Sequence, residues 1–231
     1  MGVYLFNLET LDRLLWEDHA SEKTAHDFGK DIIPNLIKSN ARVFAFPYTG
    51  YWMDVGTINS YWQAHMDMLS PNPPLKLYDR RWVIHTRTEE RPPVRFPDEA
   101  QVYASMITDG CFIEAGARVE SSVLSPGVIV RAGAIVRESI LLTDCVVESG
   151  AVVERSILDK RVIVGENARV GGGAHSPEIR LVLVGKKAEL PPEIVVEPGA
   201  EIGTDVVATD FEELYVKAGQ FVQSNRKPYE I

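Results

Sequence analysis

An aspartate lies within an aromatic, glycine-containing stretch of the chain at residues 51–57 (YWMDVGT). Asp54 follows Tyr51 and Trp52 and precedes Gly56, and Thr57 is a good N-cap for the helix that we predict next. A carboxylate on a turn between a strand and a helix, beside glycine and aromatic rings, suits a metal–phosphate or sugar site. The alternative is that Asp54 only caps the helix.

Two other stretches carry residue types that can do chemistry. Residues 27–34 (DFGKDIIP) contain Asp27, Phe28 and Lys30, and by themselves they indicate the capped start of a helix with a surface Asp–Lys pair. His175 stands in a glycine-rich loop, where a histidine is usually just solvated. In a β-helix acyltransferase, such a loop histidine can instead act as the general base.

The segments around these residues indicate a piece of an α/β layer. Hydrophobic spacing predicts helices over residues 8–18, 27–38 and 57–69, and strands over residues 2–7 and 43–46. These are too few strands for a doubly wound sheet. We therefore interpret residues 1–70 as the C-terminal remnant of an α/β domain.

Residues 71–98 are rich in proline and arginine and have no clean hydrophobic period. We interpret this stretch as an extended linker. It is either a solvated strap stiffened by its prolines, or a segment whose arginines contact a neighbouring domain or a phosphate.

An internal repeat with a period of 17 residues runs from Glu99 to Gly171. Each copy has three large aliphatic positions, spaced 5, 6 and 6 residues apart, and each is preceded two residues earlier by a smaller side chain. An offset of two places both residues on the same face of a strand. The large positions are Val102, Val119, Val136, Val153 and Val170; Ile107, Leu124, Leu141 and Leu158; and Ile113, Val130, Val147 and Val164. The small positions are Ala100, Ala117, Ala134, Ala151 and Ala168; Ser105, Ser122, Ser139 and Ser156; and Cys111, Val128, Cys145 and Val162.

This pattern predicts a three-sided β-helix with one coil per copy. Gly116, Gly133, Gly150 and Asn167 open successive copies and are residue types that tolerate the positive φ of a sharp corner. After Gly171 the repeat breaks, a further coil is expected over residues 194–203, and two short strands are expected over 213–216 and 220–223. We take residues 99–231 as one β-helix domain whose tail caps its open end.

The composition narrows the class of protein. The 231 residues carry a net charge of −9 without basic runs, which argues against nucleic acid or an anionic membrane as the main partner. There is no apolar run of membrane-spanning length and no secretory signal, so we expect a cytoplasmic protein. Cys111 and Cys145 occupy the same column two coils apart, too far for a disulfide, so we predict two free, buried thiols. We expect no metal site at these cysteines.

Taken together, these stretches resemble the ADP-glucose pyrophosphorylase (glucose-1-phosphate adenylyltransferase) family. The matching stretches are MGVYLFN, HDFGKDIIPNLI, GYWMDVGTINSYWQAHMDML, LYDRRWVIHTR, RPPVRF, SPGVIV and the repeat itself. The resemblance implies that the β-helix is left-handed and of the hexapeptide-repeat type. It also implies that residues 1–70 are the remnant of a sugar-nucleotidyltransferase domain.

The family makes ADP-glucose and pyrophosphate from ATP and glucose 1-phosphate for glycogen or starch synthesis, with Mg²⁺ neutralising charge. By resemblance, Asp54 lies beside the sugar phosphate and holds the metal, while Tyr51, Trp52 and Gly56 bind the substrate. Three further residues have a supporting role (Asp27, Phe28 and Lys30). Three basic residues near the end of the main repeat are weak effector candidates (Arg180, Lys186 and Lys187), the alternative being that they are merely solvated.

The resemblance also implies homo-oligomers, usually tetramers, assembled through the β-helix, and control by a phosphorylated metabolite. The family's ATP-binding stretch would precede residue 1, so we expect this chain alone to be inactive. Two alternatives remain open. One is a non-catalytic β-helix module that oligomerises and binds a phosphorylated effector, and the other is a hexapeptide acyltransferase that uses His175.

Overall fold

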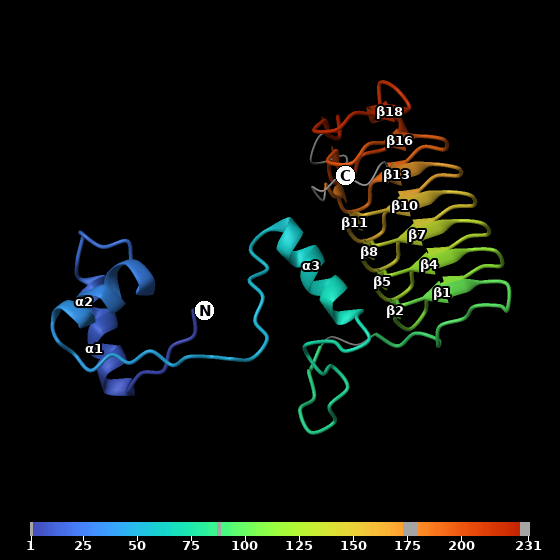
Figure 1. Ribbon diagram of the computed structural model, residues 1–231. Coiled ribbons are helices and arrows are strands. Elements are labelled where there is room, and N and C mark those ends of the chain that lie inside the picture. The colour runs from blue at the N-terminus through green and yellow to red at the C-terminus, as the bar shows by residue number, and fades with distance from the viewer. Residues whose placement is uncertain (1, 87–88, 173–179, 227–231) are drawn as a thin grey trace. The chain divides into compact units, whose positions relative to one another are not determined.

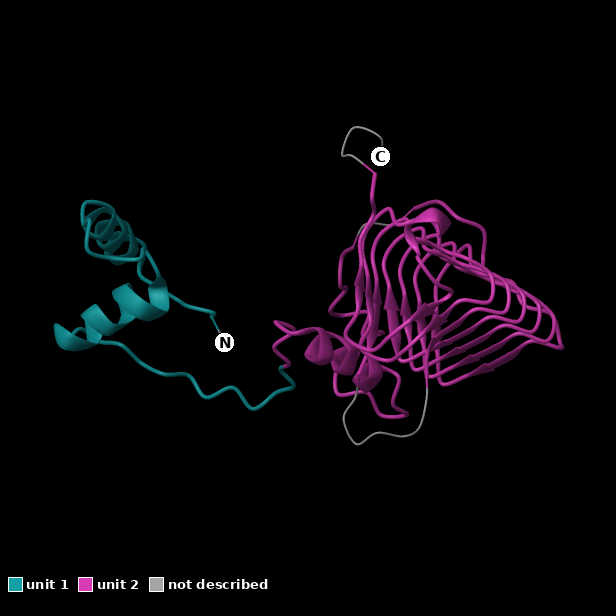
Figure 2. Ribbon diagram, turned by 90° about the horizontal axis from the view of Figure 1, so that it is seen from above, with its two compact units in different colours: residues 1–52 teal, residues 53–231 magenta. Residues whose placement is uncertain are grey.

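The computed structural model describes residues 2–86, 89–172 and 180–226. The chain divides into two compact units, residues 1–52 and residues 53–231, and each is described by itself (Figure 2). The helix expected over residues 57–69 therefore lies in the same unit as the repeat. No helix in the described part of the chain is long and apolar enough to cross a membrane.

The first unit is helical. Its elements are α1 (Leu8–His19), a π-helical turn η1 (Phe28–Ile32) and α2 (Ile33–Lys38), as Figure 1 shows. Asp27 caps the second helical stretch, because its Oδ1 accepts hydrogen bonds from the backbone N–H groups of Gly29 and Lys30, both at 2.8 Å. Both helices predicted in this region are confirmed.

The strands that we expected over residues 2–7 and 43–46 are wrong. Between Gly2 and Trp52 the structure has no strand, since a strand needs a hydrogen-bonded neighbour and this unit supplies none. The apolar side chains of both segments are consequently open to solvent, with Leu5, Phe44 and Phe46 101%, 84% and 88% exposed. This unit buries only Ile32 and Leu36 among its described apolar side chains, which is far less than an independent core requires.

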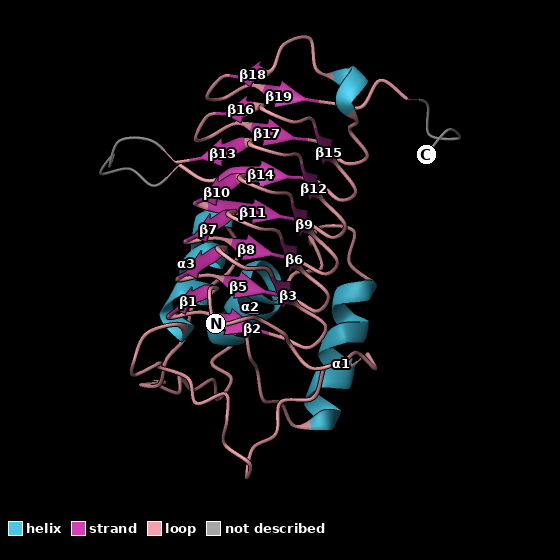
Figure 3. Cartoon of the chain, turned by 90° about the vertical axis from the view of Figure 1, so that its right-hand side faces the viewer, coloured by secondary structure: helices cyan, strands magenta, loops and turns pink. Residues whose placement is uncertain are grey.

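The second unit is a three-sided parallel β-helix whose coils stack along one axis (Figures 1 and 3). We name its three sheets by their strands. The first sheet contains β1 (Gln101–Tyr103), β4 (Arg118–Glu120), β7 (Ile135–Arg137), β10 (Val152–Glu154), β13 (Arg169–Gly171), β16 (Val195–Val196) and β18 (Tyr215–Val216). The second sheet contains β2 (Met106–Ile107), β5 (Val123–Leu124), β8 (Ile140–Leu141), β11 (Ser156–Leu158), β14 (Val182–Val184), β17 (Glu201–Ile202) and β19 (Phe221–Val222). The third sheet contains β3 (Phe112–Ile113), β6 (Ile129–Val130), β9 (Val146–Val147), β12 (Ile163–Val164) and β15 (Glu189–Leu190).

The register confirms the 17-residue repeat. In the first sheet Val102 pairs with Val119, Val136 pairs with Val153, and Val153 pairs with Val170, each at an offset of 17. The aliphatic columns of the two other sheets pair in the same way. From Ile113 to Val170 the described large aliphatic positions are fully buried. The periodic pattern therefore encodes one continuous apolar core.

The small serine column forms a ladder inside the second sheet. Ser139 Oγ donates to Arg137 O at 2.7 Å and accepts a hydrogen bond from Ser156 N at 3.1 Å. Ser122 has the same two bonds one coil earlier, donating to Glu120 O and accepting from Ser139 N. These hydroxyls are completely buried, so each must satisfy its hydrogen bonds within the protein.

The corners confirm the predicted backbone geometry. Gly116, Gly133, Gly150 and Asn167 have φ values of 74°, 68°, 70° and 56°. At the corner between the first and second sheets, however, the same left-handed conformation is adopted by side-chain-bearing residues: Ala104, Ser121, Glu138 and Arg155, with φ between 44° and 48°. Those four positions hold backbone strain that glycine would relieve.

The last part of the segment predicted as a linker, from Arg91 onward, packs on the β-helix near its end. Arg91 forms an ion pair with Asp144 (Nη1 to Oδ1, 2.6 Å), and Arg95 pairs with Phe112 in a parallel bridge that extends the third sheet by one row. The guanidinium of Arg95 lies 5.7 Å from the centre of the Phe112 ring. Arg91 and Arg95 thus contact the β-helix, while Tyr78 and Trp82 earlier in the same segment are exposed to solvent.

Candidate active site

The Asp54 turn stands at the beginning of the second unit. The carboxylate of Asp54 is exposed, and among the described residues no side chain donates a hydrogen bond to it. Gly56 lies beside this carboxylate, because a Cβ atom added to Gly56 would be 3.4 Å from Asp54 Oδ1. The turn therefore presents an unpaired carboxylate to solvent.

The helix that follows fixes where this turn ends. Helix α3 (Ile58–Met68) begins with a capping box: Thr57 Oγ1 accepts from Ser60 N, and Ser60 Oγ accepts from Thr57 N, both at 3.2 Å. The predicted N-cap is confirmed. Asp54 thus lies three residues before a defined helix start.

Helix α3 is anchored to the β-helix. The indole N–H of Trp62 donates to Glu138 O at 2.7 Å, and the Trp62 side chain is buried against Ile140 and Leu181. Tyr61 and Met66 pack at the edge of the same cluster. Burial raises the pKa of Tyr61, with a further contribution from the negative charge of Asp159. The helix that carries the Asp54 turn is therefore held on the outer face of the second sheet.

Tyr51 and Trp52 belong to the first unit. Tyr51 is half-buried, its backbone carbonyl accepts a hydrogen bond from the Tyr48 hydroxyl at 3.4 Å, and Trp52 is 52% exposed. The predicted substrate residues thus fall on both sides of the division between the two units. Their roles stay predictions.

The three supporting residues meet inside the first unit. Asp27 is the helix cap described above, and the Phe28 ring stacks on Tyr4 with ring centres 5.5 Å apart and also contacts Phe6 at 5.8 Å. The backbone N–H of Lys30 is held by Asp27, while its side chain is exposed. These contacts order the start of η1.

The predicted effector residues lie on late coils of the β-helix. Lys186 and Lys187 occupy an exposed corner, where Lys187 Nζ is 3.5 Å from Asp205 Oδ1. Arg180 is exposed, and its Cδ would lie 3.6 Å from a Cβ atom on Gly199. His175, the acyltransferase candidate, lies outside the described residues.

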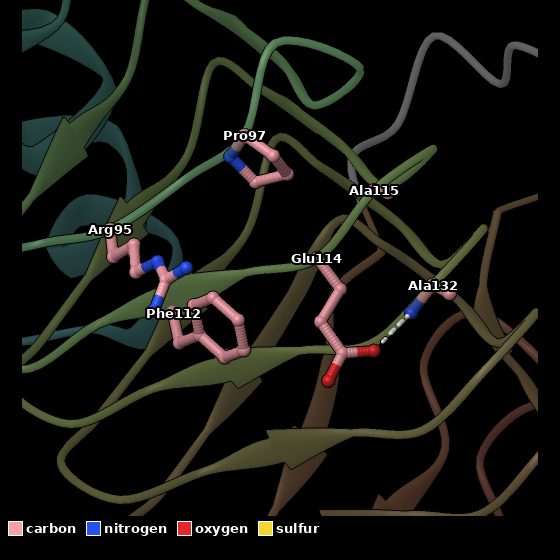
Figure 4. A pocket seen from close by; sticks show the side chains of 6 residues that line it. All are labelled: Arg95, Pro97, Phe112, Glu114, Ala115 and Ala132. Atoms are coloured by element: carbon pink, nitrogen blue, oxygen red, sulfur yellow. Dashed lines mark hydrogen bonds between the residues drawn. The ribbon is translucent and has the colours of Figure 1, made fainter.

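A shallow hollow opens on the outer face of the third sheet near its first strand (Figure 4). Arg95, Pro97 and Phe112 line one part of it, and Ala115 and Ala132 line another. Glu114 completes the lining: its carboxylate accepts from Arg131 Nη1 at 2.6 Å and from the N–H of Ala132 at 3.0 Å. The Arg131 bond lowers the pKa of Glu114.

Both cysteines are free and buried, as predicted. Cys145 Sγ donates to Asp159 O at 2.9 Å, and burial raises the pKa of this thiol to about 12. Burial also raises the pKa of Cys111. The described part of the chain contains no cluster of three or more histidine, cysteine, aspartate or glutamate residues suited to a metal ion.

Sequence reasoning missed two long-range contacts, one that anchors α3 after the Asp54 turn and one that holds the segment before the repeat on the β-helix. The Trp62–Glu138 bond spans 76 residues, and the Arg91–Asp144 pair spans 53. Only the proximity of Trp62 to the Asp54 turn could have drawn attention to it, because no local pattern specifies a partner so far along the chain.

Two family models match this chain. A nucleotidyl transferase model matches residues 1–71, and a GlmU-like, C-terminal hexapeptide model matches residues 92–181. The first includes the helices and the Asp54 turn, and the second includes most of the regular coils. Fold and site together define a nucleotidyltransferase segment joined to a hexapeptide-repeat β-helix.

Curated relatives narrow this class. The chain is 46% identical over 231 residues to a glucose-1-phosphate adenylyltransferase of Thermomicrobium roseum, covering 96% of this chain and 54% of that protein. It is 39% identical to the protein of that name from Thermotoga neapolitana and 37% identical to that from Pseudothermotoga lettingae, with the same shares covered. The chain belongs to the glucose-1-phosphate adenylyltransferase family, as the resemblance predicted, and it spans about half the length of the curated relatives it matches.

Proposed function

We propose that this chain is part of a glucose-1-phosphate adenylyltransferase, which makes ADP-glucose and pyrophosphate from ATP and glucose 1-phosphate for glycogen synthesis. The observation that carries the proposal is the intact Asp54 turn, set at the capped start of a helix that is anchored to a hexapeptide β-helix. A relative of this name is 46% identical to this chain over 96% of its length, which supports the proposal.

Asp54 is the residue that we assign to the chemistry. An exposed carboxylate without a protein partner suits Mg²⁺, which in phosphoryl-transfer sites is held by one or two carboxylates together with substrate phosphates. The ion would neutralise charge on the α-phosphate of ATP as the adenylyl group is transferred to the sugar phosphate. Asp54 would hold it beside the sugar phosphate, while Tyr51, Trp52 and Gly56 would line the sugar pocket.

The supporting role that we assign to Asp27, Phe28 and Lys30 follows from their contacts. Asp27 fixes the start of η1 through two backbone N–H groups, and the Phe28 ring packs on Tyr4 and Phe6. Lys30 takes part through its backbone N–H. They would shape the nucleotidyltransferase segment without touching the reacting atoms.

The remaining part of such an enzyme would have to cover the first unit. Leu5, Phe44 and Phe46 are almost fully exposed there, and side chains of this size are normally buried against a sheet. We therefore expect no ADP-glucose synthesis by the chain alone, and synthesis when the missing part is supplied.

The test supplies that part. The chain is co-expressed with the portion of the Thermomicrobium roseum relative that it does not match, and ADP-glucose formation is measured with ATP, glucose 1-phosphate and Mg²⁺. Activity should appear in the complex and not in the chain alone. Turnover by the chain alone, or a folded complex without activity, would overturn the proposal.

A substitution tests the role of Asp54. Asp54→Asn should lower kcat of the complex at least 100-fold, because a neutral amide binds Mg²⁺ poorly. Asp12→Asn is the matched control, since Asp12 is an exposed carboxylate on α1. Equal activity of the two variants would remove Asp54 from the chemistry.

We also propose control and assembly through the β-helix. Arg180, Lys186 and Lys187 would bind a phosphorylated metabolite, and the cytoplasmic enzyme would be a homo-oligomer, usually a tetramer in the family. Fructose 1,6-bisphosphate and 3-phosphoglycerate should raise the melting temperature of the chain, and Lys186→Ala should reduce the shift. No shift with either probe would count against this role.

A further inference from the structure

The outer face of the third sheet carries a row of residues whose order is self-complementary. The register places one outward side chain per coil, on the face opposite the buried aliphatic column. From the first coil to the last, the row is Arg95, Phe112, Ile129, Val146, Ile163 and Glu189. The cationic Arg95 lies at one end of the row, the anionic Glu189 lies at the other, and four apolar side chains lie between them.

A second outward row lies two residues further along each strand. Its members are Pro97, Glu114, Arg131, Glu148, Gly165 and Pro191. When this row is reversed, proline meets proline at the ends, Glu114 meets Gly165, and Arg131 meets Glu148 at the centre. Within one chain, Arg131 Nη1 is 2.6 Å from Glu114 and its Nε is 3.8 Å from Glu148.

The two other sheets lack this property. The outer face of the second sheet is occupied by α3, which packs on Ile140 and Ile157. The outward row of the first sheet contains Arg118 and Arg169, and reversing it sets each of these cations against an aliphatic side chain. The third sheet is therefore the face whose charges and apolar groups match a second copy of themselves.

We propose that the outer face of the third sheet binds the same face of a second copy of this chain. The two-fold axis runs parallel to the strands, between β6 (Ile129–Val130) and β9 (Val146–Val147). It places Arg95 against Glu189 of the second copy and Arg131 against Glu148 of the second copy. The apolar residues meet at the centre of this isologous interface.

The hollow beside Arg95 lies at one end of this interface (Figure 4). In the same arrangement, the β15 end of the second copy lies over it, with Glu189 directed to the guanidinium and Pro191 to the apolar lining. The third sheet is the column of strands from β3 to β15 in Figure 3.

This inference rests on the proposed function in one respect, namely that the protein is a homo-oligomer. Its test measures association of the chain and does not need enzymatic activity. The full 231-residue chain is examined by sedimentation velocity over a range of concentrations. The wild-type chain should dimerise, and Ile129→Asp should be monomeric. Val152→Asp is the matched control, because Val152 is a half-buried outward residue of the first sheet, and it should still dimerise.

Charge reversal tests the arrangement itself. Arg95 and Glu189 are five rows apart in one chain, about 24 Å at the usual strand spacing, so they cannot touch within a monomer. Arg95→Glu and Glu189→Arg should each raise the dimer dissociation constant about 10-fold, which corresponds to one like-charge contact at each end. The double variant should return it to near the wild-type value.

The possible results distinguish the proposed interface from the proposed enzymatic activity. Rescue by the double variant supports the interface, since only contact between copies can produce it. A monomeric wild-type chain, a dimer that survives Ile129→Asp, or a double variant as weak as the single ones would overturn the inference. A dimer whose co-expressed complex forms no ADP-glucose would leave the inference standing and would refute only the proposed enzyme.

Discussion

Replacing Ser139 by alanine should destabilise the β-helix by about 2–4 kcal/mol. The Ser139 hydroxyl is completely buried, donates to Arg137 O and accepts from Ser156 N. Alanine removes both bonds and keeps the fold of the strand. The amide of Ser156 then has no partner in a place that water does not reach.

The magnitude follows from these two bonds. A buried donor without a partner costs about 1–3 kcal/mol, and a lost hydrogen bond that leaves its acceptor otherwise satisfied costs about 1 kcal/mol. Arg137 O belongs to the second kind, since it also accepts from Arg155 N at 3.0 Å. The loss of the Ser156 contact is therefore the larger effect.

The next rung of the ladder provides a matched control. Ser156 is equally buried and its Oγ donates to Glu154 O at 2.8 Å. In the following coil, however, the amide of Val182 donates to Arg155 O at 3.2 Å instead of to the serine hydroxyl. Ser156→Ala leaves no amide unsatisfied in that coil and removes only the bond that Ser156 donates to Glu154 O, so it should cost less than Ser139→Ala.

Urea denaturation followed by far-ultraviolet circular dichroism measures both variants. The midpoint should fall clearly further for Ser139→Ala than for Ser156→Ala, with the same dependence on urea concentration. Equal losses for the two variants would refute the reasoning, because the side chain, its burial and its sheet are the same and only Ser139 also accepts a hydrogen bond from a backbone amide.

Three further predictions concern protons, thiols and corners. The hydrogen bond from Arg137 lowers the pKa of Glu120 in the folded chain. The ion pair therefore stabilises the folded chain at a pH above the unfolded pKa of Glu120, and this stabilisation is lost as the pH falls through the folded pKa. The melting temperature should consequently depend less on pH in the acid range for Glu120→Gln than for the wild-type chain. The buried thiol of Cys145 should react with Ellman's reagent only on unfolding, and rapid labelling of the native chain would contradict its burial. Ala104→Gly should raise stability by about 0.5–1 kcal/mol because its φ is 44°, whereas Ala115→Gly, at a position without positive φ, should lower it in the same calorimetric measurement.

The repeat could be derived from sequence because it is local. Each coil requires a large aliphatic residue at three fixed places. A 17-residue period meets this requirement only when equivalent residues of successive coils lie next to each other in the stack. Val136, Leu141 and Val147 are fully buried in the structure as their columns require. The helix cap at Thr57 could also be predicted from the sequence, since its hydrogen-bonding partner Ser60 lies within one helical turn.

Contacts between distant segments could not be derived in this way. Trp62 has no sequence signal that selects the carbonyl of Glu138, whose backbone is freed by an unusual left-handed corner. The strands predicted around Leu5 and Phe44 were wrong because the local pattern was present but its long-range partner was not. Strand propensity describes a half-buried surface, and without a neighbouring strand the same residues remain extended and exposed.

The corners of the β-helix have a consequence for how such a protein can change over time. In the second sheet the offset between paired residues rises from 17 (Ile140 to Ile157) to 26 (Ser156 to Val182), so nine residues enter between β13 and β14 while both strands keep their pairing. In the first sheet the offset from Val195 to Tyr215 is 20, three more than the repeat. Extra length between two strands leaves their pairing unaltered. New loops can therefore be gained, lost or grafted there by evolution or by an engineer, one corner at a time, without redesigning a single coil.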